Sequence, residues 1–138
     1  MTTQEIISMI GLLGIGAILR GIIDSFLKKR ETTHKAEHEH RAIRYKAALV
    51  LMYALLDFEK EKSRLQIHRP EIKNKEQLHD EIKLEFNTMI LFGSDNVLKS
   101  VKAFIHNPSE QHFHIVALAM RQDLYRIGTK LKAEDLKL

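Results

Sequence analysis

The sequence predicts an all-α protein, in which an N-terminal transmembrane helix continues into a cytoplasmic bundle of about four helices. Three observations support this prediction. Residues 6–19 form an unbroken run of apolar and small residues, and a basic cluster follows at residues 28–30. Beyond that cluster, apolar residues recur at steps of three and four, as on one face of a helix. No segment shows the sustained alternation of polar and apolar residues that is typical of a strand.

The composition limits the chain to one small domain beside the membrane segment. The chain has 138 residues. About 30 of them belong to the predicted membrane segment, so the remainder is long enough for a single hydrophobic core. There is no cysteine, which excludes disulfides and thiolate metal sites and suits a reducing compartment. Only two prolines and six glycines interrupt the chain, as expected for a compact helical domain.

The first helix is expected to cross the membrane. Residues 6–27 would form about 33 Å of helix, and the hydrocarbon core of a bilayer is roughly 30 Å thick. We therefore assign residues 1–27 to a transmembrane helix and residues 28–138 to a cytoplasmic domain. A helix that lies in the membrane interface and a buried helix of a soluble core are the alternatives. A signal peptide fits poorly, because the basic cluster comes after the apolar run.

Two charged residues interrupt the second half of this helix. Arg20 and Asp24 are four residues apart, so they share a helix face and can form an ion pair. Either Arg20 extends to the headgroups while Asp24 already lies there, or both face a protein interior or a water-filled lumen. The second alternative makes both residues candidates for lining a pore.

A stripe of small residues in the same helix predicts association between helices. Small residues let helix backbones approach closely in lipid. Packing through this stripe would turn Arg20 and Asp24 toward the central axis of a ring of protomers, although glycines are also common in membrane helices in general. The stripe consists of Gly11, Gly14, Gly21 and Ser25, with Ala17 at its edge.

The basic cluster predicts the orientation. Residues 28–46 form a basic stalk with seven basic and three acidic residues, a local balance of +4 (7 − 3) that equals the net charge of the whole chain. Because positively charged flanks stay cytoplasmic, we expect a single-pass protein of the inner membrane, with its N-terminus outside and its C-terminal domain in the cytoplasm. Lys28, Lys29 and Arg30 would contact anionic lipid headgroups.

The cytoplasmic domain is expected to begin with one long helix over residues 28–64. This range contains neither proline nor glycine. The run His68-Arg69-Pro70 marks the end of the helix, since the residue before a proline leaves helical geometry. The apolar stripe of this helix comprises Ile43, Ala47, Val50, Ala54 and Phe58.

Three further helices are expected over residues 71–92, 96–105 and 110–131. Gly93 is a good terminator for the first of them. Ser94 or Asp95 can cap the second helix, and Ser109 can cap the third. The last helix has the most regular apolar stripe, which comprises Phe113, Val116, Met120, Leu124, Ile127 and Leu131.

No motif in the sequence predicts catalysis, a cofactor or a metal. His34 and His38 have the spacing of two metal ligands, but no third ligand shares their face, so a solvated helix is the better interpretation. There is no glycine-rich phosphate loop and no nucleophile elbow. Arg121 falls beside the core stripe of the last helix, so we expect a buried structural ion pair with Asp95 or Asp57.

Two further segments bear on the family of the chain. They are Leu91-Phe92-Gly93-Ser94-Asp95-Asn96-Val97-Leu98 and Ala119-Met120-Arg121-Gln122-Asp123-Leu124. Both are similar to runs in small membrane-anchored helical proteins of bacterial defence loci. With its order of apolar helix, charged stalk and helical domain, the chain resembles most the pore-forming accessory proteins of type VI-B CRISPR systems. This resemblance implies a membrane-anchored oligomer with a divergent HEPN-like helical domain.

One departure from that family bears on activity. HEPN ribonucleases carry an Arg and a His at a wider spacing than Arg64 and His68 have here. The departure argues against an inherited nuclease activity and leaves the membrane role as the main implication of the resemblance.

The leading functional hypothesis is a self-associating membrane protein that forms a pore or perturbs the inner membrane, as an effector or accessory in antiphage defence. One alternative is a binding module that the first helix tethers at the membrane, where it holds a protein, a nucleic acid or an RNA-guided effector. Another is a HEPN-like ribonuclease that brings Arg64, His68 and Arg121 together on oligomerisation. The expected partners are the lipid bilayer and further copies of the chain, with no small-molecule substrate.

Overall fold

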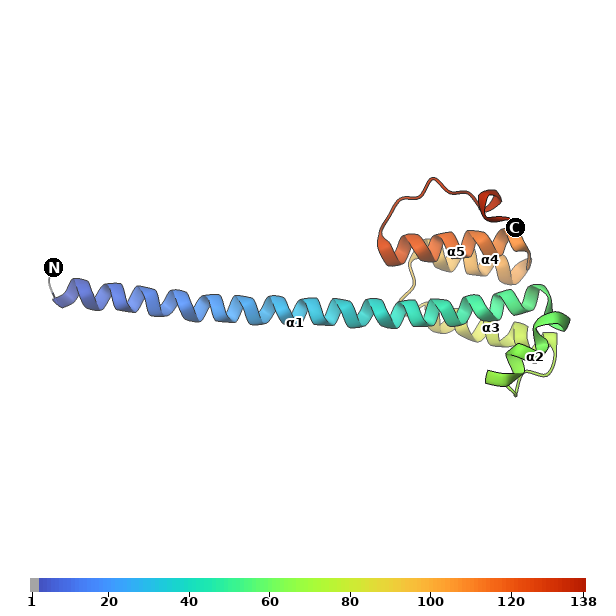
Figure 1. Cartoon of the computed structure of the whole chain (residues 1–138), viewed down its shortest axis with the longest axis horizontal. Coiled ribbons are helices and arrows are strands. Elements are labelled where there is room, and N and C mark those ends of the chain that lie inside the picture. Colours follow the sequence, from blue (N-terminus) through green and yellow to red (C-terminus); the bar gives the residue numbers. More distant parts are fainter. Residues whose placement is uncertain (1–2) are drawn as a thin grey trace. The chain divides into compact units, whose positions relative to one another are not determined.

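The structure, a computed structural model of the whole chain, describes the backbone of residues 3–138 and the side chains of residues 17–138. Over these residues it contains five α-helices, one short 3-10 helix and no strand, so the all-α prediction is confirmed. Helices α4 and α5 lie side by side (Figure 1). The elements are α1 (Thr3–Leu56), α2 (Phe58–His68), α3 (Lys75–Met89), α4 (Asp95–His106), α5 (Glu110–Tyr125) and η1 (Ala133–Leu136).

The chain divides into two compact units, and α1 contributes to both. The first unit is Met1–Glu39, and the second is His40–Leu138. The second unit contains the remainder of α1 together with α2 to α5 and η1. The division expected from the sequence, between residues 27 and 28, stays a prediction.

The long helix expected over residues 28–64 is two helices in the structure. It ends at Leu56, and α2 begins at Phe58. Asp57 lies between them with φ −143° and ψ 72°, outside helical geometry, as N-cap residues usually do. The break leaves Phe58 and Leu65 of α2 buried, which explains why an interruption without proline or glycine is stable here.

Helices α4 and α5 begin within one residue of where the sequence predicts, whereas α3 covers residues 75–89 and not 71–92. The side chains of Asn74, Ser94 and Ser109 accept hydrogen bonds from the first turns of α3, α4 and α5, at 2.8, 3.3 and 3.1 Å. These bonds satisfy backbone N–H groups that have no partner within the helix. The caps predicted at Ser94 and Ser109 are therefore confirmed.

The last helix ends earlier than expected. It stops at Tyr125, and Arg126 follows in the left-handed region with φ 51°. Ile127 and Leu131, which were expected on the core face, lie beyond this helix and are 54% and 40% exposed. The left-handed residue satisfies a carbonyl at the helix end, because the Arg126 N–H donates to the Gln122 carbonyl at 2.8 Å.

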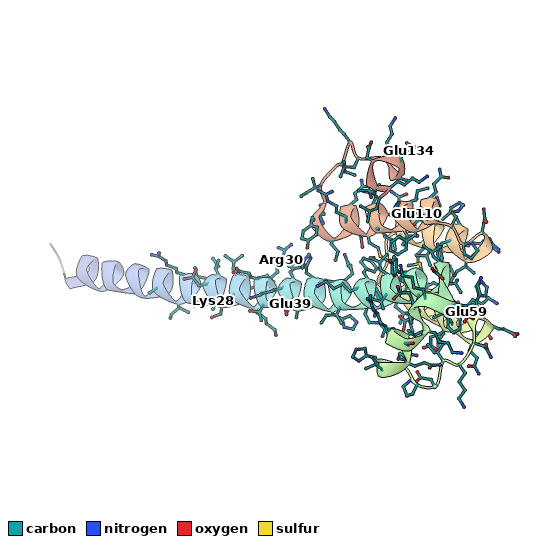
Figure 2. All side chains as sticks on the ribbon, turned by 45° about the vertical axis from the view of Figure 1, so that its right-hand side comes forward. Lys28, Arg30, Glu39, Glu59, Glu110 and Glu134 are labelled. Carbon is teal, nitrogen blue, oxygen red and sulfur yellow. The ribbon has the colours of Figure 1, made fainter. Side chains whose placement is uncertain are left out.

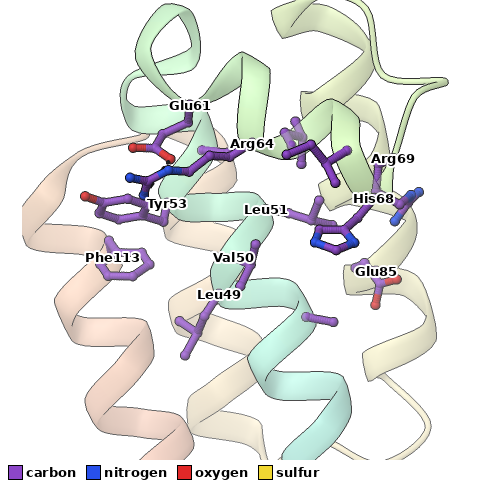
Figure 3. Close-up of a pocket in the computed structure, with 14 residues that line it drawn as sticks. Leu49, Val50, Leu51, Tyr53, Glu61, Arg64, His68, Arg69, Glu85 and Phe113 are labelled. Carbon is purple, nitrogen blue, oxygen red and sulfur yellow. Dashed lines mark ion pairs between the residues drawn. The ribbon is translucent and has the colours of Figure 1, made fainter.

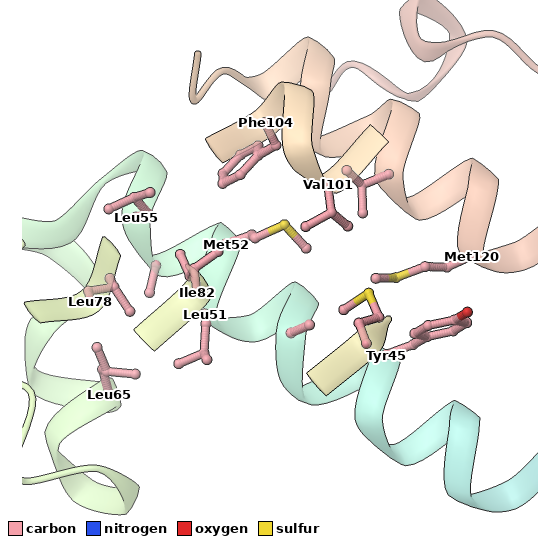
Figure 4. Close-up of a cluster of buried hydrophobic side chains, with 14 of the residues drawn as sticks. Tyr45, Leu51, Met52, Leu55, Leu65, Leu78, Ile82, Val101, Phe104 and Met120 are labelled. Atoms are coloured by element: carbon pink, nitrogen blue, oxygen red, sulfur yellow. The ribbon is translucent and has the colours of Figure 1, made fainter. Parts of the chain in front are cut away.

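The hydrophobic core lies within the second unit, where α1 packs its side chains against those of α2 to α5 (Figure 4). On α1 the core face is formed by Ala48, Leu51, Met52 and Leu55. This differs from the expected stripe, of which only Ala54 and Phe58 are buried while Ile43, Ala47 and Val50 are exposed. The expectation failed because residues 47–56 are apolar around most of the helix, so spacing alone did not identify the buried face.

The predicted membrane location is not supported by the described side chains. Among residues 17–138, no helix is long and apolar enough to cross a membrane. The described part of the expected span, residues 17–27, is about 16 Å of helix, roughly half the thickness of a bilayer core. It also contains Arg20 and Asp24. This finding overturns the predicted single-pass location in the inner membrane, with the N-terminus outside and the C-terminal domain in the cytoplasm. Residues 6–16 of that span lie outside the described side chains.

Candidate functional site

The first candidate surface is the amphipathic part of α1 in the first unit. At about 100° per residue, its large apolar side chains occupy one half of the helix circumference, and Arg20, Asp24 and Lys28 occupy the other half. We call the apolar surface the apolar half of α1; it consists of Ile18, Leu19, Ile22, Ile23, Phe26 and Leu27. Each of these six side chains is 53–67% exposed.

The residues expected in helix association are exposed wherever their side chains are described. Ala17, Gly21 and Ser25 are exposed. A Cβ added to Gly21 would meet no atom within 4 Å among the described residues. Gly11 and Gly14 lie outside the described side chains.

The charged residues of this part of α1 are also exposed. Arg20 and Asp24 were expected to pair, but the ion pairs recorded for residues 17–138 do not include one between them. The side chains of Lys28 and Arg30 extend from the helix surface (Figure 2). Lys29 is exposed as well.

The second candidate surface is an open groove in the second unit (Figure 3). Its volume is about 700 Å³. Ala47, Val50 and Ala54 of α1 line it, together with Leu65 of α2 and Phe113 of α5. Most of its surface is apolar, and its volume falls within the usual range for binding pockets, roughly 300–1,000 Å³.

Glu61 is the buried charge of this groove. Its side chain is only 11% exposed, and its one recorded ion pair is to Arg64 at 3.9 Å. That distance is too long for a hydrogen bond. Arg64 is 84% exposed, so its guanidinium is free to move into solvent. Glu61 is therefore the acidic residue of the groove without a hydrogen-bonded cation beside it, which makes it the residue best placed to bind one.

Two aromatic rings line the same groove as this carboxylate. The rings of Tyr53 and Phe113 have their centroids 5.9 Å apart (Figure 3). Two other charged residues of the groove, Glu85 and Arg69, already have close partners. Arg44 donates to Glu85 at 2.9 Å, and Arg69 donates to both Glu71 and Glu81. The hydrogen bond from Arg69 also lowers the pKa of the exposed Glu71 carboxyl.

A polar cluster in the same unit joins α1 to α5. The Tyr45 hydroxyl donates to Asp123 Oδ2 at 2.5 Å, and Arg41 Nη1 lies 3.6 Å from the same oxygen. Burial, and then the hydrogen bond to Asp123, raise the pKa of the Tyr45 hydroxyl well above its usual value. The hydroxyl therefore stays protonated, which suits a structural donor rather than a general base.

This cluster replaces the ion pair expected from the sequence. Arg121, Asp95 and Asp57 are all exposed, and no ion pair involving Arg121 is recorded among residues 17–138, so the predicted buried pair is wrong. The buried partner on α5 is Asp123, two residues and about 200° further around the helix. Its position three residues after the buried Met120 is the sequence signal that could have identified it.

The histidines do not form a metal site in the described part of the chain. His34 pairs with Glu37 at 3.7 Å on the exposed surface of α1. Among the described residues, no group of three or more His, Asp or Glu side chains is arranged to hold a metal ion. Of the three residues of the ribonuclease hypothesis, Arg64 and His68 of α2 line the groove, whereas Arg121 is exposed on α5 and does not.

No family model, curated protein or solved structure matches the chain. The resemblance to accessory proteins of type VI-B CRISPR systems therefore stays a prediction.

Proposed function

We propose that the protein is a self-associating helical module, in which the apolar half of α1 in one copy is covered by another copy. The role assigned to it is assembly rather than catalysis. The proposal keeps the self-association expected from the sequence and does not require a membrane-spanning segment.

This proposal rests on the exposure of the apolar half of α1. Six large apolar side chains, on a segment of ten residues, are each more than half exposed. Burying one such side chain contributes about 1.5–3 kcal/mol, so this surface has a strong tendency to be covered. Contiguous apolar surfaces of this kind usually mark sites of interaction.

The location of the charges on the same segment supports a protein partner. Arg20, Asp24 and Lys28 lie on the half of the helix away from the apolar side chains. Two or more such helices can bury their apolar halves against protein while these charges stay in water. Helix pairs of this kind form without any new secondary structure, which suits a segment that is already helical.

The proposal is tested by comparing two matched double variants in sedimentation velocity without detergent. I18S/I22S removes two side chains from the apolar half, whereas R20S/D24S changes two residues on the charged half and leaves the net charge unaltered. We expect I18S/I22S to weaken association by on the order of 100-fold or more, because two buried isoleucines are lost per copy. R20S/D24S should associate like the unaltered chain. Equal behaviour of the two variants would contradict the proposal.

A further inference from the structure

We infer that the groove of the second unit receives a defined stripe of α1 from a second copy, and that Lys29 of that stripe binds Glu61. The stripe consists of Ile18, Ile22, Phe26 and Lys29. This inference deepens the proposed function and rests on it, since it names the surface that covers the apolar half of α1.

The stripe is a single line of side chains along α1. At about 100° per residue, its four members fall within roughly 80° of the helix circumference. Three of them are large and apolar, and the fourth is a cation one turn further on. Apolar anchors at such spacing are how helices dock into grooves.

The lengths of the stripe and the groove agree. From Ala47 to Ala54, the α1 residues that line the groove extend over about 10 Å of helix. From Ile18 to Phe26, the apolar part of the stripe extends over about 12 Å. Ala47 and Ala54 have small side chains, so a second helix can approach this part of α1 closely.

Charge complementarity sets the direction of the docked helix. Glu61 lies in the first turn of α2, which follows α1 just beyond Ala54, whereas Glu85 is paired with Arg44, three residues before Ala47 in the chain (Figure 3). A helix that runs parallel to α1 of the receiving copy places Ile18 near Ala47 and Lys29 beyond Ala54, toward Glu61. The ammonium group of Lys29 then supplies the close partner that Glu61 lacks, and the exposed Arg64 moves into solvent.

The occupant that we assign to the groove is a second copy. The stripe and the α1 residues that line the groove belong to one continuous helix, Thr3–Leu56. The two contacting surfaces are different, so the interface is heterologous, and repetition of it builds a closed ring or an open chain of copies.

Cysteine cross-linking tests the contact directly, because the chain contains no cysteine of its own. Two separately tagged preparations of the full chain are mixed, one carrying I22C and the other V50C, and treated with a short bis-maleimide. We expect a cross-linked heterodimer at least tenfold more abundant than from D24C mixed with V50C, since Asp24 lies on the charged half of the helix. Cross-links mainly between two I22C chains, or equal yields from the two mixtures, would overturn the inference.

Charge substitution tests the direction of docking. Lys29→Glu should weaken association about tenfold, whereas Lys28→Glu, the same change on the charged half, should weaken it less than threefold. The double variant K29E/E61K should regain most of the lost affinity. Equal effects of K29E and K28E would overturn the inference, and so would a K29E/E61K variant that folds normally but associates no better than K29E.

The outcomes separate this inference from the proposed function. If the unaltered chain does not associate, both are wrong. If it associates and I18S/I22S weakens it, but K29E acts like K28E and the I22C chains cross-link to each other, then self-association stands and the groove is not its acceptor.

Discussion

At the scale of single residues, the contact between Tyr45 and Asp123 is the main polar link between α1 and α5. Tyr45 is 1% exposed, and its hydroxyl donates to a carboxylate that also faces Arg41. The Nε atom of Arg41 is buried without a hydrogen-bond partner among the described residues. Asp123 thus depends on Tyr45 for its only short hydrogen bond in this cluster, and loss of that bond leaves a partly buried carboxylate poorly satisfied.

We therefore expect Tyr45→Phe to lower the free energy of unfolding by about 1–3 kcal/mol. The matched control is Tyr53→Phe, which removes a hydroxyl from a side chain that is 51% exposed and should change stability by less than about 0.5 kcal/mol. Urea unfolding followed by circular dichroism measures both. Equal effects of the two variants would show that the Tyr45 hydroxyl does not stabilise the contact between helices.

The raised pKa of Tyr45 also predicts a dependence on pH. In the unfolded chain the hydroxyl ionises near pH 10, whereas in the folded protein it ionises only at higher pH. The stabilisation is therefore complete below about pH 10 and is lost as the pH rises above that value. Unfolding free energies measured from pH 8 to 11 should fall more steeply for the unaltered chain than for Tyr45→Phe. Parallel curves would contradict this assignment.

Gly93 lies at a position where the neighbouring atoms leave too little room for a side chain. A Cβ at this position would lie 2.9 Å from the Met89 carbonyl oxygen and 3.2 Å from Met89 Cγ. We expect Gly93→Ala to destabilise the protein by about 1–3 kcal/mol, because the turn between α3 and α4 must shift. Gly128→Ala is the control, since its Cβ would meet nothing within 4 Å. Thermal unfolding should separate the two variants, and an equally small change in both would disprove the steric argument.

At the scale of elements, helix starts are set by local hydrogen bonds. Ser109 accepts from the His112 N–H at 3.1 Å and so caps α5. Ser109→Ala should reduce the free energy of unfolding by about 1 kcal/mol. Ser63→Ala, an exposed change within α2, should leave it unchanged or slightly higher, since alanine favours the helix. A loss at Ser63 as large as that at Ser109 would count against capping as the cause.

The same elements show what could be predicted from the sequence. The caps at Ser94 and Ser109 were predicted because their effect depends on residues three positions away. The break at Asp57 was not predicted, since it depends on the burial of Phe58 and Leu65 against distant helices. The buried face of α1 was also missed, because Ala47 and Val50 are as apolar as the core residues Ala48 and Leu51 beside them.

The groove could not be predicted from the sequence, because its residues meet only in the folded protein. It brings together residues from α1, α2 and α5 that are far apart in the chain, such as Val50, Leu65 and Phe113. Glu61 was not identified from the sequence, because only the packing around α2 leaves this residue 8% exposed. The polar cluster of Arg41, Tyr45 and Asp123 was missed because Arg121 lies equally close to the core stripe in the sequence.

At the scale of the whole molecule, each of the two units leaves apolar surface uncovered. The first unit exposes the apolar half of α1, and the second exposes Ile43 and Val50 by 66% and 61%. Apolar surfaces of this kind are removed from water when copies of the chain cover one another. The proposed self-association would cover apolar surface on both units, and it is the central claim about this protein.

The molar mass of the unaltered full chain in detergent-free solution tests that claim most directly. Light scattering across a dilution series should give a multiple of 16.0 kDa that falls toward one copy on dilution. A constant mass of 16.0 kDa up to about 100 μM, from protein that is fully helical and folded, would contradict self-association through α1.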